Sequence, residues 1–272
     1  MVTFLDTASL LDADEPAPFE IFNPDGRAPV LFVADHASNR IPRCLGGLGL
    51  SVADQQRHIA WDIGSADLTM SLSLLLNAPA VLCGYSRLVI DCNRLPGDPD
   101  SIPVSSDGTV VPGNCDLSEA GQEIRTTDIF NPYHQAVADT LAHMWRRCPS
   151  VPPALLAIHS FTPQLLSIKH PPRPWQVGLL WNRDPRLAVP LMDRLRALQG
   201  GFCIGDNQPY SGRDIAFTVD RHAASAGLPH AGIEVRQDEI DTKNKAHVWA
   251  CRLVEVLGPL VGHPDVHRVC HY

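Results

Sequence analysis

Apolar and polar residues follow two recurring patterns along this chain. Short apolar runs bounded by Pro, Gly or polar residues are typical of buried strands. Longer stretches with an apolar residue at every third or fourth position are typical of amphipathic helices. The apolar runs predict strands over residues 29–34, 80–84, 154–158, 176–181, 201–205 and 231–235. The helical pattern covers residues 51–76, 118–147, 185–198, 218–226 and 243–257.

The alternation of these elements predicts the fold class. It is typical of an α/β fold with a mostly parallel mixed sheet and helices on both faces. The chain has 272 residues, of which 44% are hydrophobic, enough to bury a substantial core as one unit. We expect one α/β domain over residues 1–272, with an N-terminal extension at 1–20 and a short tail at 262–272.

Local signals refine the second predicted helix and the loops. The sequence Asp116-x-x-Glu119 is a candidate capping pair for this helix, and Pro132 is expected to interrupt it. Residues 95–114 and 162–174 are rich in loop-forming residues. Because long loops in compact domains are often functional, we expect both to border one pocket.

Charge and composition exclude several classes of protein. The net charge is −8, and no Lys/Arg run is longer than Arg146–Arg147, so a nucleic-acid-binding surface is not expected. Apolar stretches are shorter than the roughly 18–20 residues that span a bilayer. The acidic N-terminus lacks the order of a signal peptide, which predicts a cytoplasmic protein. Eight cysteines without a C-x-x-C pair argue against a zinc ribbon or a disulfide framework.

Chemically versatile residues cluster between positions 35 and 94. The motifs are Asp35–Pro42, Ala60–Gly64 and Ser86–Arg94, and the first and last follow the predicted strands at 29–34 and 80–84. In open α/β sheets, ligands bind just beyond the carboxyl ends of the strands. Histidine, aspartate, asparagine and arginine at such an edge indicate a hydrolytic site for an anionic substrate.

Two of the twelve histidines are candidate metal ligands. His36 and His159 each follow a predicted strand directly. Imidazole is the commonest metal ligand, and two at neighbouring strand ends are able to share one ion. The alternative is that each histidine only caps its strand. His134, on the long predicted helix, is a further candidate for a place in the site.

Six motifs follow one another along the chain. They are His36–Pro42, Trp61–Gly64, Ser86–Arg94, Asn131–His134, Ile158–Phe161 and Gly232–Asp238. In this order they resemble the N-formylglutamate amidohydrolase family, over roughly residues 20 to 260. That family is similar to zinc-dependent acylases such as succinylglutamate desuccinylase and aspartoacylase, and more distantly to zinc carboxypeptidases. The resemblance implies a zinc-exopeptidase-type (phosphorylase/hydrolase-like) α/β fold and hydrolysis of an amide beside a carboxylate.

The resemblance also implies roles for individual residues. His36 and His159 match the histidine zinc ligands, and Glu234 matches the general base. The alternative for Glu234 is an ion pair with Arg236, which shares its face of the strand at i, i+2 spacing.

For the substrate, Asn93 and Arg94 match the pair that binds its carboxylate, with His134 as a further contact. Arg87 is expected to assist catalysis as a cation. Its alternative is a salt bridge with Asp91 that shapes the end of the strand.

The third metal ligand is left open by the sequence. The acylase motif has a glutamate three residues after its first histidine, and this chain has Asn39 there. An amide oxygen is a weak zinc ligand beside carboxylate or imidazole. Asp62 is the preferred replacement, with Asp35 as the next candidate.

We therefore expect a zinc-dependent amidohydrolase that acts on a small acidic N-acyl amino acid, such as N-formylglutamate. Another divalent metal is a variant of the same hypothesis. One alternative is a non-catalytic anion-binding protein on the same scaffold, which Asn39 favours. Another is a hydrolase with a different N-acyl or amide substrate.

Overall fold

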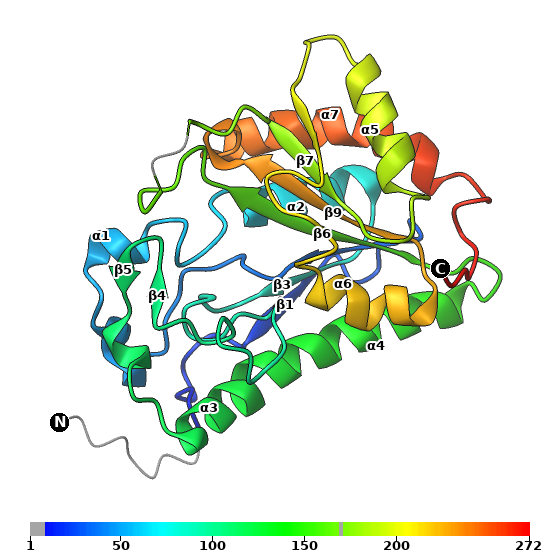
Figure 1. Ribbon diagram of the computed structural model, residues 1–272. Helices are drawn as coiled ribbons and strands as arrows, with labels where there is room; N and C mark the ends of the chain where they lie inside the picture. The colour runs from blue at the N-terminus through cyan, green and yellow to red at the C-terminus, as the bar shows by residue number, and fades with distance from the viewer. Residues whose placement is uncertain (1–8, 169–170) are drawn as a thin grey trace.

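The computed structural model describes residues 9–168 and 171–272. Its centre is a seven-stranded sheet with the order β1-β3-β2-β6-β9-β7-β8 (Figure 1). A separate β4–β5 hairpin lies beyond it. The strands are β1 (Phe19–Phe22), β2 (Val30–Ala34), β3 (Ala80–Cys83), β4 (Ser105–Ser106), β5 (Thr109–Val110), β6 (Ala154–Phe161), β7 (Val177–Leu180), β8 (Ile204–Asp206) and β9 (His230–Arg236).

The sheet is mixed but mostly parallel, which confirms the predicted fold class. β3, β2, β6 and β9 run parallel to one another, and β8 is parallel to β7. β7 is antiparallel to β9, and β1 is antiparallel to β3. All six predicted strands are present. β1 was not predicted, because it is a short edge strand with half-exposed residues that crosses the end of the expected N-terminal extension. Residues 1–8 of that extension lie outside the described residues.

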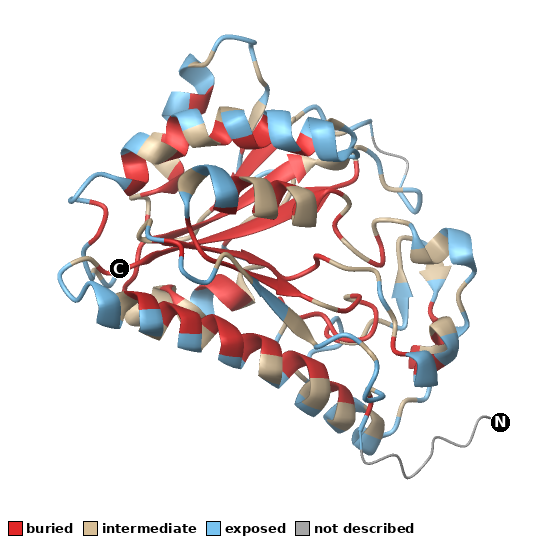
Figure 2. Ribbon diagram, turned by 180° about the vertical axis from the view of Figure 1, so that it is seen from behind, coloured by how far each residue is buried: buried red, intermediate tan, exposed pale blue. Residues whose placement is uncertain are grey.

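Helices cover both faces of the sheet, and their buried sides face it (Figures 1 and 2). α2, α5 and α7 pack on one face in one apolar core, and α4 and α6 pack on the other face in a second core. The α-helices are α1 (Val52–Gln55), α2 (Ser65–Leu76), α3 (Glu119–Arg125), α4 (Asn131–Arg147), α5 (Ala188–Ala197), α6 (Phe217–His222) and α7 (Lys243–Val261). Within the described residues, no helix is both long and apolar enough to cross a membrane.

The helix predicted over residues 51–76 was wrong in its middle. α1 ends at Gln55 and α2 begins at Ser65, with turns between them. Gly64 has a φ of +82° and packs closely against the backbone of Ile240, where a Cβ would clash. This left-handed residue separates the two helices and places Asp62 in a turn rather than on a helix.

The predicted helix over 118–147 exists as α3 and α4, joined by a π-helical turn at Thr126–Phe130. The interruption was predicted, and Pro132 lies in the first turn of α4, where proline is tolerated. The predicted capping pair was wrong. Ser118 is the N-cap, with its side chain accepting a hydrogen bond from Gly121 N, and Asp116 lies before it in a left-handed conformation.

Candidate active site

The candidate site lies where the parallel strands end. His36 follows β2, the segment from Arg87 to Asn93 follows β3, and His159 and Glu234 lie near the ends of β6 and β9. His159 and Glu234 are partners in the β6–β9 register, so their side chains share one face of the sheet. The sheet thus brings together residues from four separate parts of the sequence.

Asp62 reaches these strands from the turn before α2. Its backbone N–H donates to the carbonyl of His36 at 3.0 Å, and its own carbonyl accepts from Ser65 N at 3.1 Å. These bonds fix the buried Asp62 carboxylate between the two histidines.

Both histidines direct one ring nitrogen at the same carboxylate oxygen. Asp62 Oδ2 lies 3.2 Å from His36 Nδ1 and 2.9 Å from His159 Nδ1. The three side chains are buried, and each offers a ligand atom within 4.8 Å of the others. Neighbouring ligands in a tetrahedral zinc site are about 3.3–3.5 Å apart, given bonds of about 2.0–2.2 Å. The group therefore has the dimensions of a three-ligand metal site.

The other nitrogen of each histidine faces an outer carboxylate. His36 Nε2 lies 2.8 Å from Asp91 Oδ1, and His159 Nε2 lies 3.3 Å from Asp35 Oδ2. Asp35 also accepts hydrogen bonds from Tyr133 Oη at 2.6 Å and from the Thr218 hydroxyl at 2.8 Å. Histidines that bind metals are commonly oriented by a carboxylate on the far nitrogen, and both candidate ligands have one here.

The charges of this cluster also suit a cation. Each imidazole has carboxylates at both nitrogens, whereas a neutral ring has only one N–H to donate. Burial opposes the charged form, and Arg87 repels that of His36. The adjacent carboxylates nevertheless raise the pKa of His36, and raise that of His159 well above its usual value. A divalent ion between the rings supplies the positive charge that protons otherwise bring.

Glu234 lies beside this group without a hydrogen-bond partner for one oxygen. Its Oε2 is fully buried and unpaired, and burial raises the pKa of Glu234 to about 7. Arg236, the alternative partner proposed from the sequence, pairs with Asp238 and Glu239 instead. A buried carboxyl that titrates near neutral pH and faces a cavity is suited to accept a proton.

Arg87 forms the salt bridge considered for it and also reaches the cavity. Its guanidinium donates to Asp91 Oδ2 at 2.6 Å, so the predicted salt bridge exists, and it also lies 3.4 Å from Asp62 Oδ1. The side chain is about a quarter exposed and lines the cavity. It is thus able to contact a ligand while it orients both carboxylates.

A cavity of about 140 Å³ opens over the cluster. Asn93 and Arg94 line it, as predicted for the substrate contacts, and so do Phe161, Thr162 and Tyr210. Asn93 Oδ1 accepts from Thr218 N at 3.1 Å, and Arg94 donates one hydrogen bond, at 3.0 Å, to the Asn93 carbonyl. Asn93 N donates to Asp91 Oδ1 at 2.8 Å, which turns the chain here and lets neighbouring side chains reach one cavity.

Two predicted candidates lie elsewhere. His134 is buried and is absent from the described residues that line the cavity. Its Nε2 bonds to the Cys92 carbonyl and its Nδ1 to His222, each at 2.8 Å, so both ring nitrogens are engaged and one of them supports the segment after β3. Asn39 donates to the Gln55 carbonyl at 3.0 Å and also does not line the cavity. Of the three candidates for the third ligand, Asp62 is therefore the one that faces both histidines.

His58 is a cavity residue that the sequence did not identify. It lines the wall, and its Nε2 lies 3.4 Å from Asp107 Oδ2. Asp107, in the turn of the β4–β5 hairpin, also accepts from Leu166 N and Ser167 N at 3.0 and 2.8 Å. The two long loops predicted to border the pocket are thus joined through Asp107. The sequence did not predict the contact between Asp107 and His58, because the two residues are far apart in the chain.

Comparisons with known proteins agree with this geometry. A search of curated proteins found no match. The crystal structure of gene product Atu2144 from Agrobacterium tumefaciens is similar to this chain, with 32% sequence identity and a TM-score of 0.86. The match covers 93% of this chain and 98% of the Atu2144 chain. An N-formylglutamate amidohydrolase from Ralstonia eutropha JMP134 shares the fold at 19% identity, with a TM-score of 0.65 and coverage of 92% and 99%.

The family described as N-formylglutamate amidohydrolase matches residues 28–240, a segment that includes every residue of the cluster described above. The motifs that carried the resemblance in the sequence are thus the ones that the fold gathers around one cavity. The chain belongs to the N-formylglutamate amidohydrolase family.

Proposed function

We propose that this protein is a metal-dependent amidohydrolase that cleaves the amide of an acidic N-acyl amino acid, with N-formyl-L-glutamate as the reference substrate. The observation that carries the proposal is the buried group of His36, Asp62 and His159, with Glu234 beside it at the same cavity. Family membership supports amide hydrolysis. The cationic cavity wall supports an anionic substrate.

His36, Asp62 and His159 would hold the metal, and zinc fits the donor set of two imidazoles and one carboxylate. When bound with an open position, zinc acidifies a water molecule and polarises a carbonyl group. Asp91 and Asp35 keep the far nitrogens of the histidines engaged, so the near nitrogens stay directed at Asp62.

Glu234 would perform the proton transfers. Its free oxygen is buried at the cavity and is ready to accept a proton from the attacking water. Formation of the tetrahedral adduct leaves that proton on Glu234, which then delivers it to the amine nitrogen as the amide bond breaks. The products are a carboxylic acid and an amino acid.

Arg87 and Arg94 would bind the negative charges of the substrate. Both line the cavity, and a guanidinium offers paired N–H groups that match a carboxylate. Arg87 lies nearer to the metal ligands, through its contacts with Asp62 and Asp91. It is therefore the better placed of the two to stabilise charge on the carbonyl oxygen.

The alternative of a non-catalytic anion-binding protein loses its main support. It rested on Asn39 as a replaced metal ligand, and Asn39 is bonded to Gln55 outside the cavity. The unpaired oxygen of Glu234 has a role in hydrolysis and none in anion binding.

The test combines metal content with turnover. The protein is purified without added metal, assayed for bound zinc, and then tested for release of formate from N-formyl-L-glutamate before and after chelation. We expect about one metal per chain and activity that chelation removes and zinc restores. Turnover that is unaffected by complete removal of metal contradicts the metal-dependent mechanism, and no turnover in the metal-loaded protein contradicts the proposed function.

A further inference from the structure

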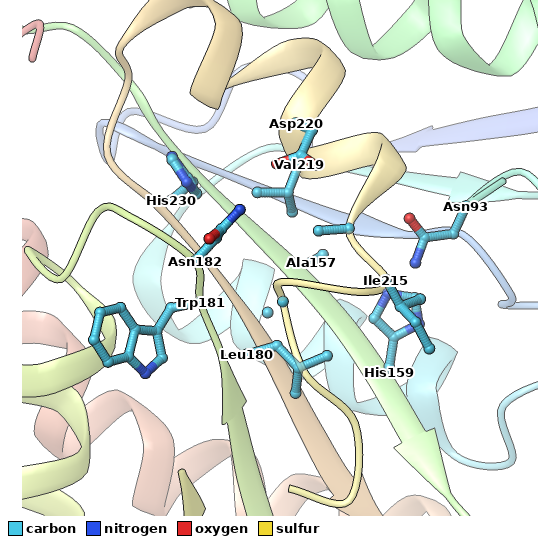
Figure 3. Close-up of a pocket in the computed structure, with 13 residues that line it drawn as sticks. Asn93, Ala157, His159, Leu180, Trp181, Asn182, Ile215, Val219, Asp220 and His230 are labelled. Atoms are coloured by element: carbon cyan, nitrogen blue, oxygen red, sulfur yellow. The ribbon is translucent and has the colours of Figure 1, made fainter. Parts of the chain in front are cut away.

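A second cavity lies directly behind His159. It is small, about 20 Å³, and it lies between the sheet and α6. Figure 3 shows it running from His159 and Asn93, past Ala157, towards His230. Its wall shares four residues with the larger cavity, so the two spaces adjoin beside His159, one of the candidate metal ligands. The shared residues are Asn93, His159, Leu180 and Ile215.

The register of the sheet creates this space. His159 pairs with Glu234, and two residues earlier Ala157 pairs with Gly232. Gly232 pairs in turn with Leu180 on β7. Residues two apart in a strand lie on the same face of the sheet. Ala157, Gly232 and Leu180 therefore form a row directly behind the row of His159 and Glu234. Ala and Gly have the smallest side chains, which leaves an opening bounded by Leu180.

The opening requires glycine at position 232, because Leu180 lies too close to leave room for a side chain there. A Cβ at this position would lie 3.0 Å from Leu180 Cβ, tighter than ordinary van der Waals contact. Any side chain at position 232 would therefore fill the space or displace Leu180.

The two cavities differ in charge. The larger one is lined by Arg87 and Arg94. The smaller one is lined by Asp220, and its described wall contains no arginine or lysine. An anionic group therefore finds guanidinium donors only in the first cavity, whereas the second, with Asp220 on its wall beside His159 and His230, suits a small uncharged group.

We propose that the second cavity is the acyl subsite, which admits an uncharged acyl group no larger than acetyl and excludes longer or anionic groups such as succinyl. This inference rests on the proposed function. An amide held at His159 and Glu234 has its amino acid and its acyl substituent on opposite sides. If the amino acid carboxylates occupy the cavity of Arg87 and Arg94, the acyl group extends towards Ala157.

The volume of the cavity sets the limit on size. A water molecule needs roughly 10–15 Å³ of such space, so 20 Å³ admits little more than one non-hydrogen atom beyond the carbonyl group. A formyl group leaves this space unused and an acetyl group fills it with its methyl. A propionyl group requires Leu180 to move.

The test measures binding in the full-length, zinc-loaded Glu234→Gln variant, which leaves the amide intact. Calorimetry compares N-formyl-, N-acetyl-, N-propionyl- and N-succinyl-L-glutamate. We expect the first two to bind within about tenfold of each other. N-Propionyl-L-glutamate should bind roughly 10- to 200-fold more weakly, the range for one methylene group in a tight pocket. N-Succinyl-L-glutamate, which is longer and charged, should bind at least as weakly.

Second substitutions in the Glu234→Gln variant test which residues set the limit on acyl size. Leu180→Ala, or the milder Leu180→Val, should recover most of the binding of N-propionyl-L-glutamate. Gly232→Ala should weaken N-acetyl-L-glutamate while N-formyl-L-glutamate still binds. Leu179→Ala is the matched control, because it removes the same atoms from a buried residue on the opposite face of β7.

The proposal is overturned if propionyl and formyl derivatives bind equally to the Glu234→Gln protein. It is also overturned if Leu180→Val and Leu179→Ala have the same acyl profile. Failure of the wild-type enzyme to hydrolyse N-formyl-L-glutamate contradicts the proposed function instead, because the binding series does not depend on turnover.

Discussion

The Nε2 atom of His36 lies 2.8 Å from Asp91 Oδ1, and this contact leaves Nδ1 of the same ring directed at Asp62. Asp91 is itself held by Arg87 at 2.6 Å and by the backbone N–H of Asn93 at 2.8 Å. The segment after β3 therefore controls the orientation of a residue that follows β2. In the proposed metal site, this contact would orient the His36 ring, as outer carboxylates commonly do for histidines that bind metals.

We predict that Asp91→Asn weakens zinc binding by about 10- to 100-fold, the usual cost of losing an outer carboxylate. Competition with a chromogenic chelator measures the change. Asp35→Asn should have a smaller effect, because the His159 contact is longer, at 3.3 Å. Unchanged zinc affinity in Asp91→Asn would show that Asp91 does not support the metal site and serves only its contacts with Arg87 and Asn93.

His159→Ala should remove the metal and abolish hydrolysis, since two remaining ligands bind zinc weakly. His36→Ala should have the same result. Metal analysis and circular dichroism of each variant separate loss of the ion from loss of the fold. A fully occupied metal site in His159→Ala would exclude this histidine as a ligand.

Glu234→Gln keeps the shape of the side chain and removes the proton acceptor. We expect kcat to fall by roughly 10²- to 10⁴-fold, the usual contribution of a positioned acid–base group, while zinc remains bound. Glu255→Gln, an exposed change on α7, is the matched control. Activity near that of the control would assign Glu234 a structural role.

The buried pair of His134 and His222 predicts how stability depends on pH. Burial lowers the pKa of His134 to about 4 and that of His222 to about 3, from an ordinary value of 6.5. Between pH 4 and 6.5 the unfolded chain binds protons that the folded protein does not, so the free energy of unfolding decreases as the pH falls. Each histidine contributes up to about 1.4 kcal/mol per pH unit.

The measurement compares urea unfolding of the wild type with that of His222→Asn across this pH range. The wild type should lose stability more steeply as the pH falls. Glu234, whose pKa burial raises to about 7, changes stability in the opposite direction here, but equally in both proteins, so its effect cancels in the difference. Parallel slopes would contradict the assignment.

The sequence predicted the strands and most of the site because each depends on local pattern. Apolar runs defined six of the strands, and strand ends placed His36 and His159 at one edge, whereas Glu234 was identified only through the family resemblance. The turn that carries Asp62 was not predicted, because apolar residues have helical spacing throughout residues 51–76. Gly64, packed against Ile240, fixes where α2 begins, and this is a contact between distant parts of the chain.

Other features depended on distant contacts in the same way. His134 carries a family motif, yet its two nitrogens are used by Cys92 and His222. His58 enters the cavity wall through the loop conformation near Asp107. Such assignments require knowledge of which segments pack together, which no local pattern contains.

Our last prediction is that Arg94 sets the preference for an acidic substrate. It lines the cavity beside Asn93, and one of its guanidinium nitrogens donates to the Asn93 carbonyl, which holds the side chain in place. Lysine keeps the charge but loses the paired N–H geometry that matches a carboxylate. Arg94→Lys should therefore raise KM for N-formyl-L-glutamate at least tenfold, with a smaller change in kcat. The lost contact stabilises the bound substrate and the transition state equally, so its loss weakens binding rather than the chemical step.

Steady-state kinetics with two substrates make this test specific. An N-formyl amine that lacks carboxylates should be a poor substrate of the wild type, and Arg94→Lys should not make it worse. Arg146→Lys, an exposed change at the end of α4, controls for the substitution itself. If the wild type cleaves both substrates equally well, or if Arg94→Lys matches Arg146→Lys on the acidic one, then Arg94 does not recognise a carboxylate. In the first case the enzyme has no preference for acidic substrates, and that part of the proposed function is wrong. In the second case the preference would have to come from Arg87, the other arginine that lines the cavity.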